Sequence, residues 1–291
     1  MFEKVLLPTD FSPDSQKVIA YVQDLPGTRE VLLFHVVDAT RPSRQGEDHN
    51  RQVENARALL EKTREELERN KMKAEVALET IANPIMQGDV PLTILEKAEE
   101  EKVSLIMMGA RGKNTIQNIL LGSVSANVIR RAKIPVLLMR FPPELHATDT
   151  HRHLFSRVLV PVDFSSPSES IISLIKGIPA TGQVLLLHVV DKGESETEIK
   201  ESVSNAWEKL GAIAADLAAA GIAAESRVHV GYAPDEINAM AEKDDVTLIL
   251  MSPVGEGWRR ELRALFIGST TNAVMRRAHR PVLIAAGHTG T

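Results

Sequence analysis

Cysteine is absent from this sequence, and its absence excludes several kinds of chemistry at once. A chain without thiols has no disulfide, no thiol nucleophile, no iron–sulfur cluster and no thiolate zinc site. The absence also fits a reducing compartment, so we expect a cytoplasmic protein. His146, His151 and His153 are interpreted as solvated linker residues, and no metal site built from protein ligands is expected.

Long apolar runs are also missing. The longest apolar region, from Ala212 to Ala224, is interrupted by Asp216 and Gly221, whereas a membrane-spanning helix needs about 20 apolar residues. The first residues lead directly into an apolar strand, so neither a secretion signal nor a membrane partner is expected. A net charge of -5 argues against nucleic acid as the main partner, because nucleic-acid binding usually requires a basic face.

The chain repeats itself. At 291 residues it is long enough for two domains, each with its own core. The block Lys4–Ser12, KVLLPTDFS, returns as Arg157–Ser165, RVLVPVDFS, and at the same offset Val31–Asp38 returns as Val184–Asp191. Two blocks at one spacing indicate a tandem repeat.

Within each copy, short runs of Val, Ile and Leu alternate with longer amphipathic stretches. This alternation is typical of a parallel sheet covered by helices on both faces. We predict an α/β fold of two tandem doubly wound domains, 1–141 and 156–291, joined by a linker at 142–155. Each domain should hold a five-stranded parallel sheet of order 3-2-1-4-5. The strands expected in the first copy are Lys4–Pro8, Glu30–Val37, Lys73–Thr80, Val103–Met108 and Pro135–Met139.

A spaced glycine pattern lies in the first copy where a strand gives way to a helix. Gly109-x-x-Gly112 is followed after nine residues by Gly122-Ser123. Glycine lets the backbone approach a phosphate closely enough for several N–H groups to converge on it. We expect Ser123 at the N-cap of a helix over Val124–Ala132, where the helix dipole favours an anion. The alternative interpretation is a flexible surface connection.

Asp10 ends the first predicted strand. In the order 3-2-1-4-5 it lies beside Gly109, at the point where the winding of the sheet reverses and doubly wound folds bind ligands. A carboxylate beside a phosphate loop suits the two hydroxyls of a ribose, so the pattern indicates a nucleotide. The alternative is a turn-forming role for Asp10 ahead of the helix that begins near Pro13.

Together these blocks resemble the universal stress protein family, and the resemblance covers both copies. It is carried by the strand ending in Pro-Thr-Asp-Phe-Ser, the His-Val after strand two, the spaced glycine motif and the following Val-Ser-Ala-Asn-Val-Ile-Arg-Arg-Ala-Lys-Ile-Pro-Val. The resemblance implies a fold of the adenine nucleotide alpha-hydrolase-like type, in the ATP-binding branch of the family. By position, the resemblance implies that four residues surround the adenine and the ribose: Pro8, Thr9, Asp10 and Val36. It implies that seven residues surround the phosphates: Met108, Gly109, Gly112, Gly122, Ser123, Val124 and Ser125.

The resemblance also implies how the copies associate and what they bind. It implies pairing of the last strands, Pro135–Met139 against Pro281–Ala285, and leaves a homodimer of whole chains open. The implied ligand is ATP or AMP, with Mg²⁺ compatible with ATP. The implied role is a stress-response or signalling module with an unidentified protein partner.

The second copy departs from the pattern in its glycine loop. Val162 replaces Thr9, Ser252 replaces Gly109 and is followed by Pro253, and twelve residues instead of nine separate Gly255 from Gly268. We therefore predict a weak or nucleotide-free second site. Its residues would be Pro161, Asp163, Val189, Gly268, Ser269, Thr270 and Thr271.

Arginines in the altered loop leave two alternatives open. Arg259, Arg260 and Arg263, beside Trp258, either replace backbone donors as phosphate ligands or form a solvated basic helix start. A preference of the second copy for AMP over ATP is a further alternative.

An enzyme is the alternative from another functional class: a slow ATPase or an adenylating enzyme on the same fold. The sequence favours this less, because it offers no recognisable general base or arginine finger near the predicted phosphates. We predict no catalytic residue. A structural partner-binding protein with vestigial pockets would leave the glycine loop unexplained.

Overall fold

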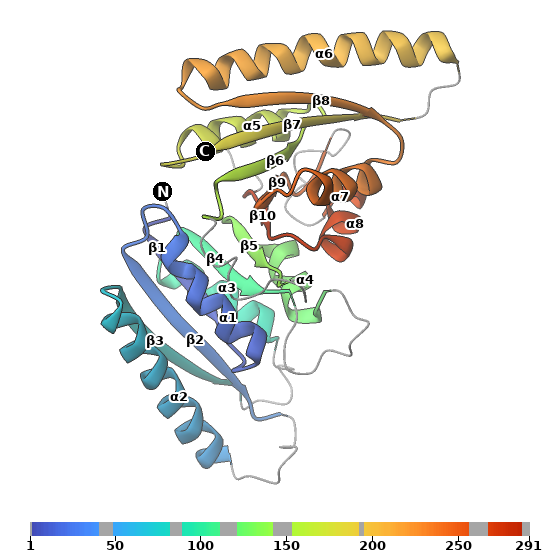
Figure 1. Cartoon of the computed structure of the whole chain (residues 1–291). Helices are drawn as coiled ribbons and strands as arrows, with labels where there is room; N and C mark the ends of the chain where they lie inside the picture. The colour runs from blue at the N-terminus through green and yellow to red at the C-terminus, as the bar shows by residue number, and fades with distance from the viewer. Residues whose placement is uncertain are drawn as a thin grey trace. The chain divides into compact units, whose positions relative to one another are not determined.

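The computed structural model describes residues 2–40, 49–81, 89–110, 121–141, 153–191, 195–255 and 267–286. The chain divides into two compact units, Met1–Ala132 and Lys133–Thr291. Each unit is built on a sheet whose strands alternate with helices along the chain (Figure 1).

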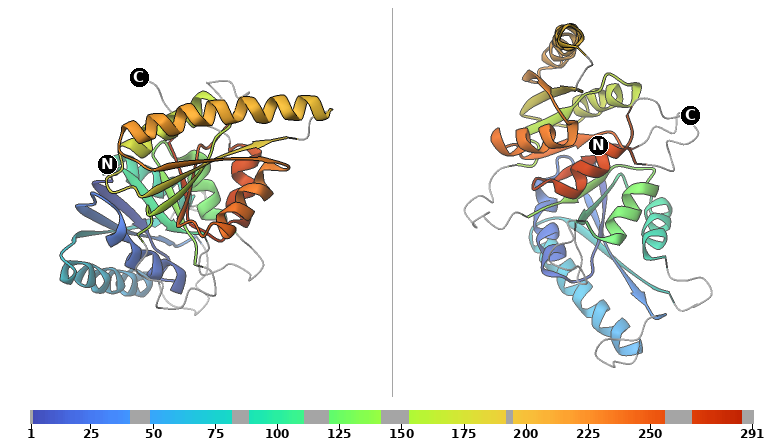
Figure 2. Two further views of the ribbon diagram at one scale, coloured as in Figure 1. Left: turned by 45° about the horizontal axis from the view of Figure 1, so that its top comes forward. Right: turned by 90° about the vertical axis from the view of Figure 1, so that its right-hand side faces the viewer.

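The first unit contains a parallel sheet with the order β3-β2-β1-β4. Because crossovers between parallel strands are right-handed, α1 and α2 cover one face and α3 and α4 cover the other, as Figure 2 shows. Its elements are β1 (Lys4–Pro8), α1 (Pro13–Tyr21), η1 (Val22–Asp24), β2 (Glu30–Asp38), α2 (His49–Arg69), β3 (Lys73–Ile81), α3 (Val90–Glu100), β4 (Leu105–Gly109) and α4 (Ser123–Arg131).

The second unit repeats this plan and adds one strand. Its sheet has the order β5-β10-β9-β6-β7-β8, in which β5 is antiparallel to β10 and the other pairs are parallel. Its elements are β5 (Val136–Met139), β6 (Arg157–Pro161), α5 (Ser166–Lys176), β7 (Gln183–Val190), α6 (Glu196–Ala219), β8 (Ala224–Val230), α7 (Ala233–Lys243), β9 (Leu248–Met251), α8 (Ser269–Arg277) and β10 (Val282–Ile284).

The middle of each central strand is apolar because helices cover both faces of the sheet there. Val5, Leu6 and Leu7 of β1 are each at most 1% exposed, and the matching run in β6 is equally buried. Strands buried on both faces have continuous rather than alternating apolar sequences, which is the pattern used to predict them. Among the described residues, no helix is long and apolar enough to cross a membrane.

The α/β fold predicted from the sequence is confirmed. The second copy has the strand order β8-β7-β6-β9-β10, which is 3-2-1-4-5, and the first unit has the matching order over its four strands. The fifth predicted strand of the first copy, β5, groups with the second unit. The unit division therefore falls at Ala132, ahead of the predicted domain limit at 141; most of the predicted linker lies outside the described residues.

The pairing of β5 with β10 is the one that the family resemblance implied. Val136 pairs with Ile284 and Leu138 with Val282, and these side chains are at most 3% exposed. Arg140, just after β5, is 7% exposed, and its Nη2 donates a hydrogen bond to the carbonyl oxygen of Met275 in the last turn of α8. The last carbonyls of a helix lack helical partners, so a buried cation there satisfies one of them.

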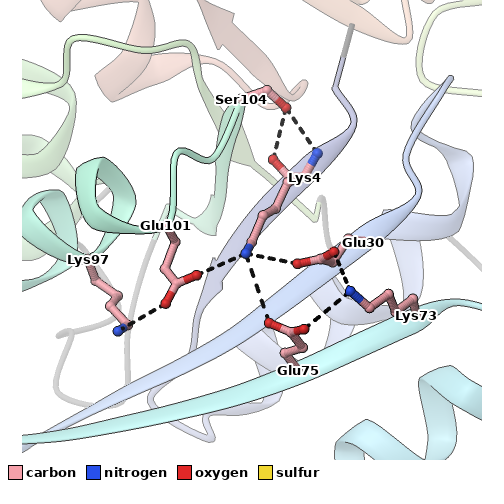
Figure 3. Close-up of polar contacts among 7 residues, drawn as sticks. All are labelled: Lys4, Glu30, Lys73, Glu75, Lys97, Glu101 and Ser104. Carbon is pink, nitrogen blue, oxygen red and sulfur yellow. Dashed lines mark hydrogen bonds and ion pairs between the residues drawn. The ribbon is translucent and has the colours of Figure 1, made fainter.

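A cluster of charges joins the strands of the first unit at the end where β1 begins (Figure 3). Lys4, Glu30 and Lys73 occupy one register row across β1, β2 and β3. The Lys4 Nζ lies 2.8 Å from a Glu30 oxygen and 2.9 Å from a Glu101 oxygen, and the Lys73 Nζ lies 2.6 Å from Glu30. The Ser104 hydroxyl adds a hydrogen bond to the Lys4 carbonyl oxygen at 2.9 Å. These contacts connect the starts of four strands or their flanking loops.

The cluster shifts the titration of its own members. Hydrogen bonds from Lys4 and Lys73 hold the pKa of the Glu30 carboxyl below its ordinary value. The Glu30 and Glu101 carboxylates raise the pKa of the Lys4 ammonium above its ordinary value. The Glu30 contribution to stability is therefore present above its unfolded pKa, about 4.3, and is lost as pH falls through the lower folded value.

Replacing Glu30 by Gln should destabilise the first unit by about 1 kcal/mol at pH 7, because two ammonium groups lose their shared carboxylate. Glutamine fits the position sterically, since Gln183 occupies it in the second copy. Urea unfolding followed by far-UV circular dichroism should show the difference from the unsubstituted chain shrinking below pH 4. Glu3→Gln, at a carboxylate whose side chain is 64% exposed, is the control; an equal effect of both substitutions would contradict the assignment.

Candidate functional site

The site is positioned by the pairing of β1 with β4. Val5 pairs with Leu105 and Leu6 with Ile106, so the chain leaves both strands at the same edge of the sheet. Because β1 lies between β2 and β4, this edge is the point where the winding reverses. The second copy repeats the geometry, with Val158 of β6 paired with Leu248 of β9.

The loop after β1 is a tight turn held by Asp10. The backbone N–H of Ser12 donates to the Asp10 Oδ1 at 3.0 Å, and Phe11 between them has a left-handed φ of 59°. In the second copy the N–H of Ser165 donates to Asp163 at 3.1 Å, and Phe164 has a φ of 60°. The turn-forming alternative for Asp10 is thus present in both copies. The turn also fixes the direction of the carboxylate, which is what a binding role would require.

A histidine from the second strand of each copy braces this turn. The His35 Nδ1 lies 2.7 Å from the Thr9 carbonyl oxygen, and the His35 ring packs on Phe11 with ring centroids 4.5 Å apart. His188 makes the same contacts with the Val162 carbonyl oxygen and Phe164, at the same two distances. Both histidines therefore have a structural role at the turn in each copy. Their link to the turn was not predicted, because no sequence spacing connects the two strands.

The helix after the glycine loop begins one residue earlier than predicted. Gly122 is the N-cap of α4 and Ser123 is its first helical residue, so the prediction of Ser123 as N-cap is wrong. Among the described residues no side chain caps this helix end, and its first N–H groups have no partner within the helix. An uncapped helix start carries the positive end of the helix dipole and suits an anion.

Two hydrogen bonds fasten the helix start to the end of β4. The Gly122 N–H donates to the Ala110 carbonyl oxygen at 2.8 Å, and the Ser125 hydroxyl donates to the Gly109 carbonyl oxygen at 2.8 Å. Ser125 is 4% exposed. Its hydroxyl therefore positions the loop in addition to the ligand role that the resemblance implied.

The structure brings most of the predicted first-copy residues to this edge. Pro8, Thr9 and Asp10 follow β1, and Val36 lies in β2 with a partly exposed side chain. Three further groups lie at the end of β4 and the start of α4: Met108 with Gly109, Gly122 with Ser123, and Val124 with Ser125. Gly112 lies outside the described residues, as do Trp258, Arg259, Arg260 and Arg263 of the second copy.

The second copy has a cavity of about 250 Å³ at the same edge, which we call the second-copy cavity. It is lined from β6, β7, α7, the loop after β9 and the start of α8. All of the residues predicted for the second site line it: Pro161, Asp163, Val189, Gly268, Ser269, Thr270 and Thr271. The copy departs from the family pattern in its loop but keeps a formed pocket.

Sequence reasoning missed one wall of this cavity. Ala233 and Ile237 of α7 line it, together with His188, Ser252 and Gly255. The α7 residues could have been found only from the crossover, which returns that helix across the sheet beside β9. Among the described residues, no group of three or more His, Cys, Asp or Glu side chains could hold a metal ion.

Comparison with known proteins gives one consistent result. The model of the "Universal stress protein family" matches residues 1–140 and 154–286. A universal stress protein of Methanocaldococcus jannaschii is 29% identical over 157 residues, 48% of this chain and 96% of that protein. One from Synechocystis is 27% identical over 234 residues, covering 77% of this chain and 75% of that protein.

A solved structure extends the likeness to the whole chain. The crystal structure of a universal stress protein from Archaeoglobus fulgidus is 27% identical, with a TM-score of 0.68, and the match covers 98% of this chain and 97% of that one. The family model matches both copies, and the repeated Asp turn and helix start lie where its spaced motif was read in the sequence. The chain belongs to the universal stress protein family.

Proposed function

We propose that this chain binds an adenine nucleotide, with ATP in its first domain, and acts as a cytoplasmic stress-response or signalling module. The observation that carries the proposal is the convergence of a fixed carboxylate and an uncapped helix start at one edge of the sheet. In the second copy the same convergence encloses a cavity. A nucleotide needs both features, because its sugar offers hydroxyl donors and its phosphates need N–H donors.

Each part of the nucleotide has a chemical counterpart. The ribose hydroxyls would donate to Asp10, whose direction the Asx turn fixes. The phosphates would accept from first-turn N–H groups of α4, at Ser123 and Val124, where the helix dipole adds attraction. The base would lie against Pro8 and Val36. Mg²⁺ would accompany ATP by binding to its phosphate oxygens.

Bound nucleotide would then act by changing the first domain itself. Bound phosphates would lie over the start of α4 and the end of β4, and this would change the surface and the charge offered to a protein partner. The difference in the partner's affinity for the ATP-bound and the nucleotide-free chain sets how far its binding can shift. The proposed role is therefore a nucleotide-dependent switch in partner choice.

Nucleotide released from the purified protein by denaturation should be an adenine nucleotide, identified by chromatography and mass spectrometry. Asp10→Ala and Gly122→Val should each lower ATP affinity about tenfold to a hundredfold, because each removes or blocks hydrogen bonds to charged or hydroxyl groups. Gly122 has φ -72° and ψ 153°, a conformation open to valine, so the second substitution tests access without backbone strain.

The matched controls are Asp163→Ala and Gly268→Val, which alter the second copy and should leave ATP in the first domain. Retention of the same nucleotide at the same occupancy by both first-domain variants would refute the proposed site.

Incubation with ATP and Mg²⁺ over hours should yield at most about one ADP per chain, because binding without a positioned base does not sustain hydrolysis. Radiolabelled or coupled phosphate release measures this turnover. Many turnovers per chain, abolished by Gly122→Val, would replace the binding module by a slow ATPase.

A further inference from the structure

The outer end of the sheet in the second unit is an open edge. β8 is the last strand in the order of that sheet, and among the described strands it pairs with β7 alone. Every residue of β8 is at least partly exposed, whereas the middle of β7 is buried. We propose that this edge and one side of α6 form the surface through which two chains associate as a two-fold symmetric dimer. Neither feature lines the second-copy cavity.

The backbone of β8 presents hydrogen-bonding groups along this edge. The Val184 N–H donates to the Ala223 carbonyl oxygen at 2.8 Å, and the Gly231 N–H donates to the Val190 carbonyl oxygen at 3.0 Å. Odd-numbered residues of this segment therefore turn their backbone groups toward β7. Because these groups alternate sides along a strand, four residues point theirs away from β7: Ala224, Ser226, Val228 and Val230. Such a row of backbone groups is a template for another strand.

The side chains of β8 suit antiparallel pairing of this strand with its own counterpart. With the two-fold axis at Ser226, Glu225 lies opposite Arg227 of the partner subunit, and the axis repeats this ion pair. In the same register the two Ser226 residues exchange backbone hydrogen bonds, as the outward direction of their groups requires. The Arg227 Nη2 and a Glu225 oxygen lie 2.5 Å apart within one chain, so the dimer would join four charges of alternating sign. In-register parallel pairing would instead set like charges side by side.

One side of α6 faces the same end of the sheet. The Lys209 Nζ lies 5.0 Å from the centroid of the Phe164 ring, and the Lys176 Nζ of α5 lies 2.5 Å from Asp216. These contacts turn one side of α6 inward, toward α5 and the turn after β6. With 3.6 residues per turn, the opposite side holds four residues, which we call the Trp207 face: Trp207, Gly211, Ala214 and Ala218. Because α6 packs along β8 (Figure 1), this face is directed outward over the open edge.

The Trp207 face is apolar and accessible. The Trp207 side chain is 47% exposed, and a Cβ atom added to Gly211 would meet no atom within 4 Å. Ala218 is exposed as well. Tryptophan is enriched in protein–protein interfaces, where its large apolar surface is buried, and small residues beside it let a neighbouring helix approach.

The first copy shows that the fold does not require an apolar surface here. Buried residues at one spacing match α2 to α6: Ala56, Leu60 and Leu67 against Ala206, Leu210 and Leu217. At the positions of the Trp207 face, α2 carries only charged residues: Arg57, Glu61, Arg64 and Glu68. The Arg64 guanidinium lies 2.7 Å from both of these carboxylates. A helix side that faces solvent keeps such charges, so their replacement in the second copy indicates a contact with protein.

The strand edge and the Trp207 face fit one dimer. The His229 Nδ1 lies 2.8 Å from Glu236 of α7, so odd-numbered side chains of β8 are on the α7 side of the sheet and Ser226 is on the α6 side. Pairing two β8 strands would place the two α6 helices next to each other on that side. If each helix lies over its own β7–β8 pair, the helix axes are two strand spacings of about 4.8 Å apart. This separation of about 10 Å is that of packed helices.

The absence of cysteine from the chain makes a direct test of the strand pairing possible. Ser226→Cys in the full chain places one thiol at the two-fold axis, where paired Cα atoms lie about 5.5 Å apart, a separation that a disulfide spans. A mild oxidant should link this variant into dimers on a non-reducing gel. Val76→Cys, at the matching position of β3 in the first copy, is the control and should stay unlinked.

Sedimentation velocity on the full chain tests the charge pairing. The unsubstituted chain should change from monomer to dimer between about 1 and about 100 µM. Glu225→Arg and Arg227→Glu should each raise the dissociation constant at least about tenfold, because like charges then meet across the axis. An equimolar mixture of the two variants should dimerise again, since each supplies the charge that the other lacks. Local damage to the fold would not be repaired by mixing.

The helix contact has its own matched variants. Trp207→Arg gives α6 the residue that α2 has at this position and should raise the dissociation constant at least about tenfold. Leu59→Lys makes the reverse comparison: it changes a side chain of α2 that is 43% exposed into the residue that α6 has there. This control should leave dimerisation unchanged. Far-UV circular dichroism establishes that each variant is folded.

A chain that stays monomeric at about 100 µM, or a dimer that these substitutions leave unchanged, would overturn the proposed surface. Linking of Val76→Cys without linking of Ser226→Cys would assign the contact to β3 and overturn it as well. Nucleotide binding by the first domain is measured separately, so these results leave the proposed function standing.

Discussion

The parallel pairing of β1 with both β2 and β4 is the constraint on which the site depends. It brings the turn after one strand and the glycine loop after another, far apart in sequence, to one edge of the sheet. Backbone pairing brings the carboxylate and the helix start together, and local hydrogen bonds of Asp10, Gly122 and Ser125 then hold each of them in place. Charged side chains at the opposite end of the strands, around Lys4 and Glu30, stabilise the same register without entering the site.

The two copies show which parts of the site the fold requires and which are free to vary. The Asp turn, the left-handed Phe and the bracing His are kept with nearly equal distances, because together they shape the backbone. The sequence after the fourth strand has changed: Ser252 and Pro253 stand where the first copy has Gly109 and Ala110. The two copies therefore share the backbone frame of the site and differ in the loop after the fourth strand.

Most of the fold could be predicted because its signals are local. β1 was predicted at Lys4–Pro8, as observed, since an apolar run bounded by polar residues marks a strand buried on both faces. The start of α4 was displaced by one residue, because Gly122 and Ser123 are both acceptable N-caps and only the backbone decides. The α7 residues that line the second-copy cavity were not predicted. Which residues of α7 face the cavity depends on the path of the helix across the sheet, and no motif spacing in the sequence indicates that path. The left-handed φ of Phe11 had no signal at all, since glycine or asparagine usually marks it.

The antiparallel pairing of β5 with β10 makes the end of the first repeat part of the core of the second unit. A fragment cut at the repeat boundary would expose the edge of β10, whose residues Val282–Ile284 are at most 3% exposed in the whole chain. An apolar unpaired edge recruits another strand. The separated second half would therefore self-associate through this edge. During synthesis, β5 of the first repeat is made before β10, so its strand is already present when β10 pairs with it.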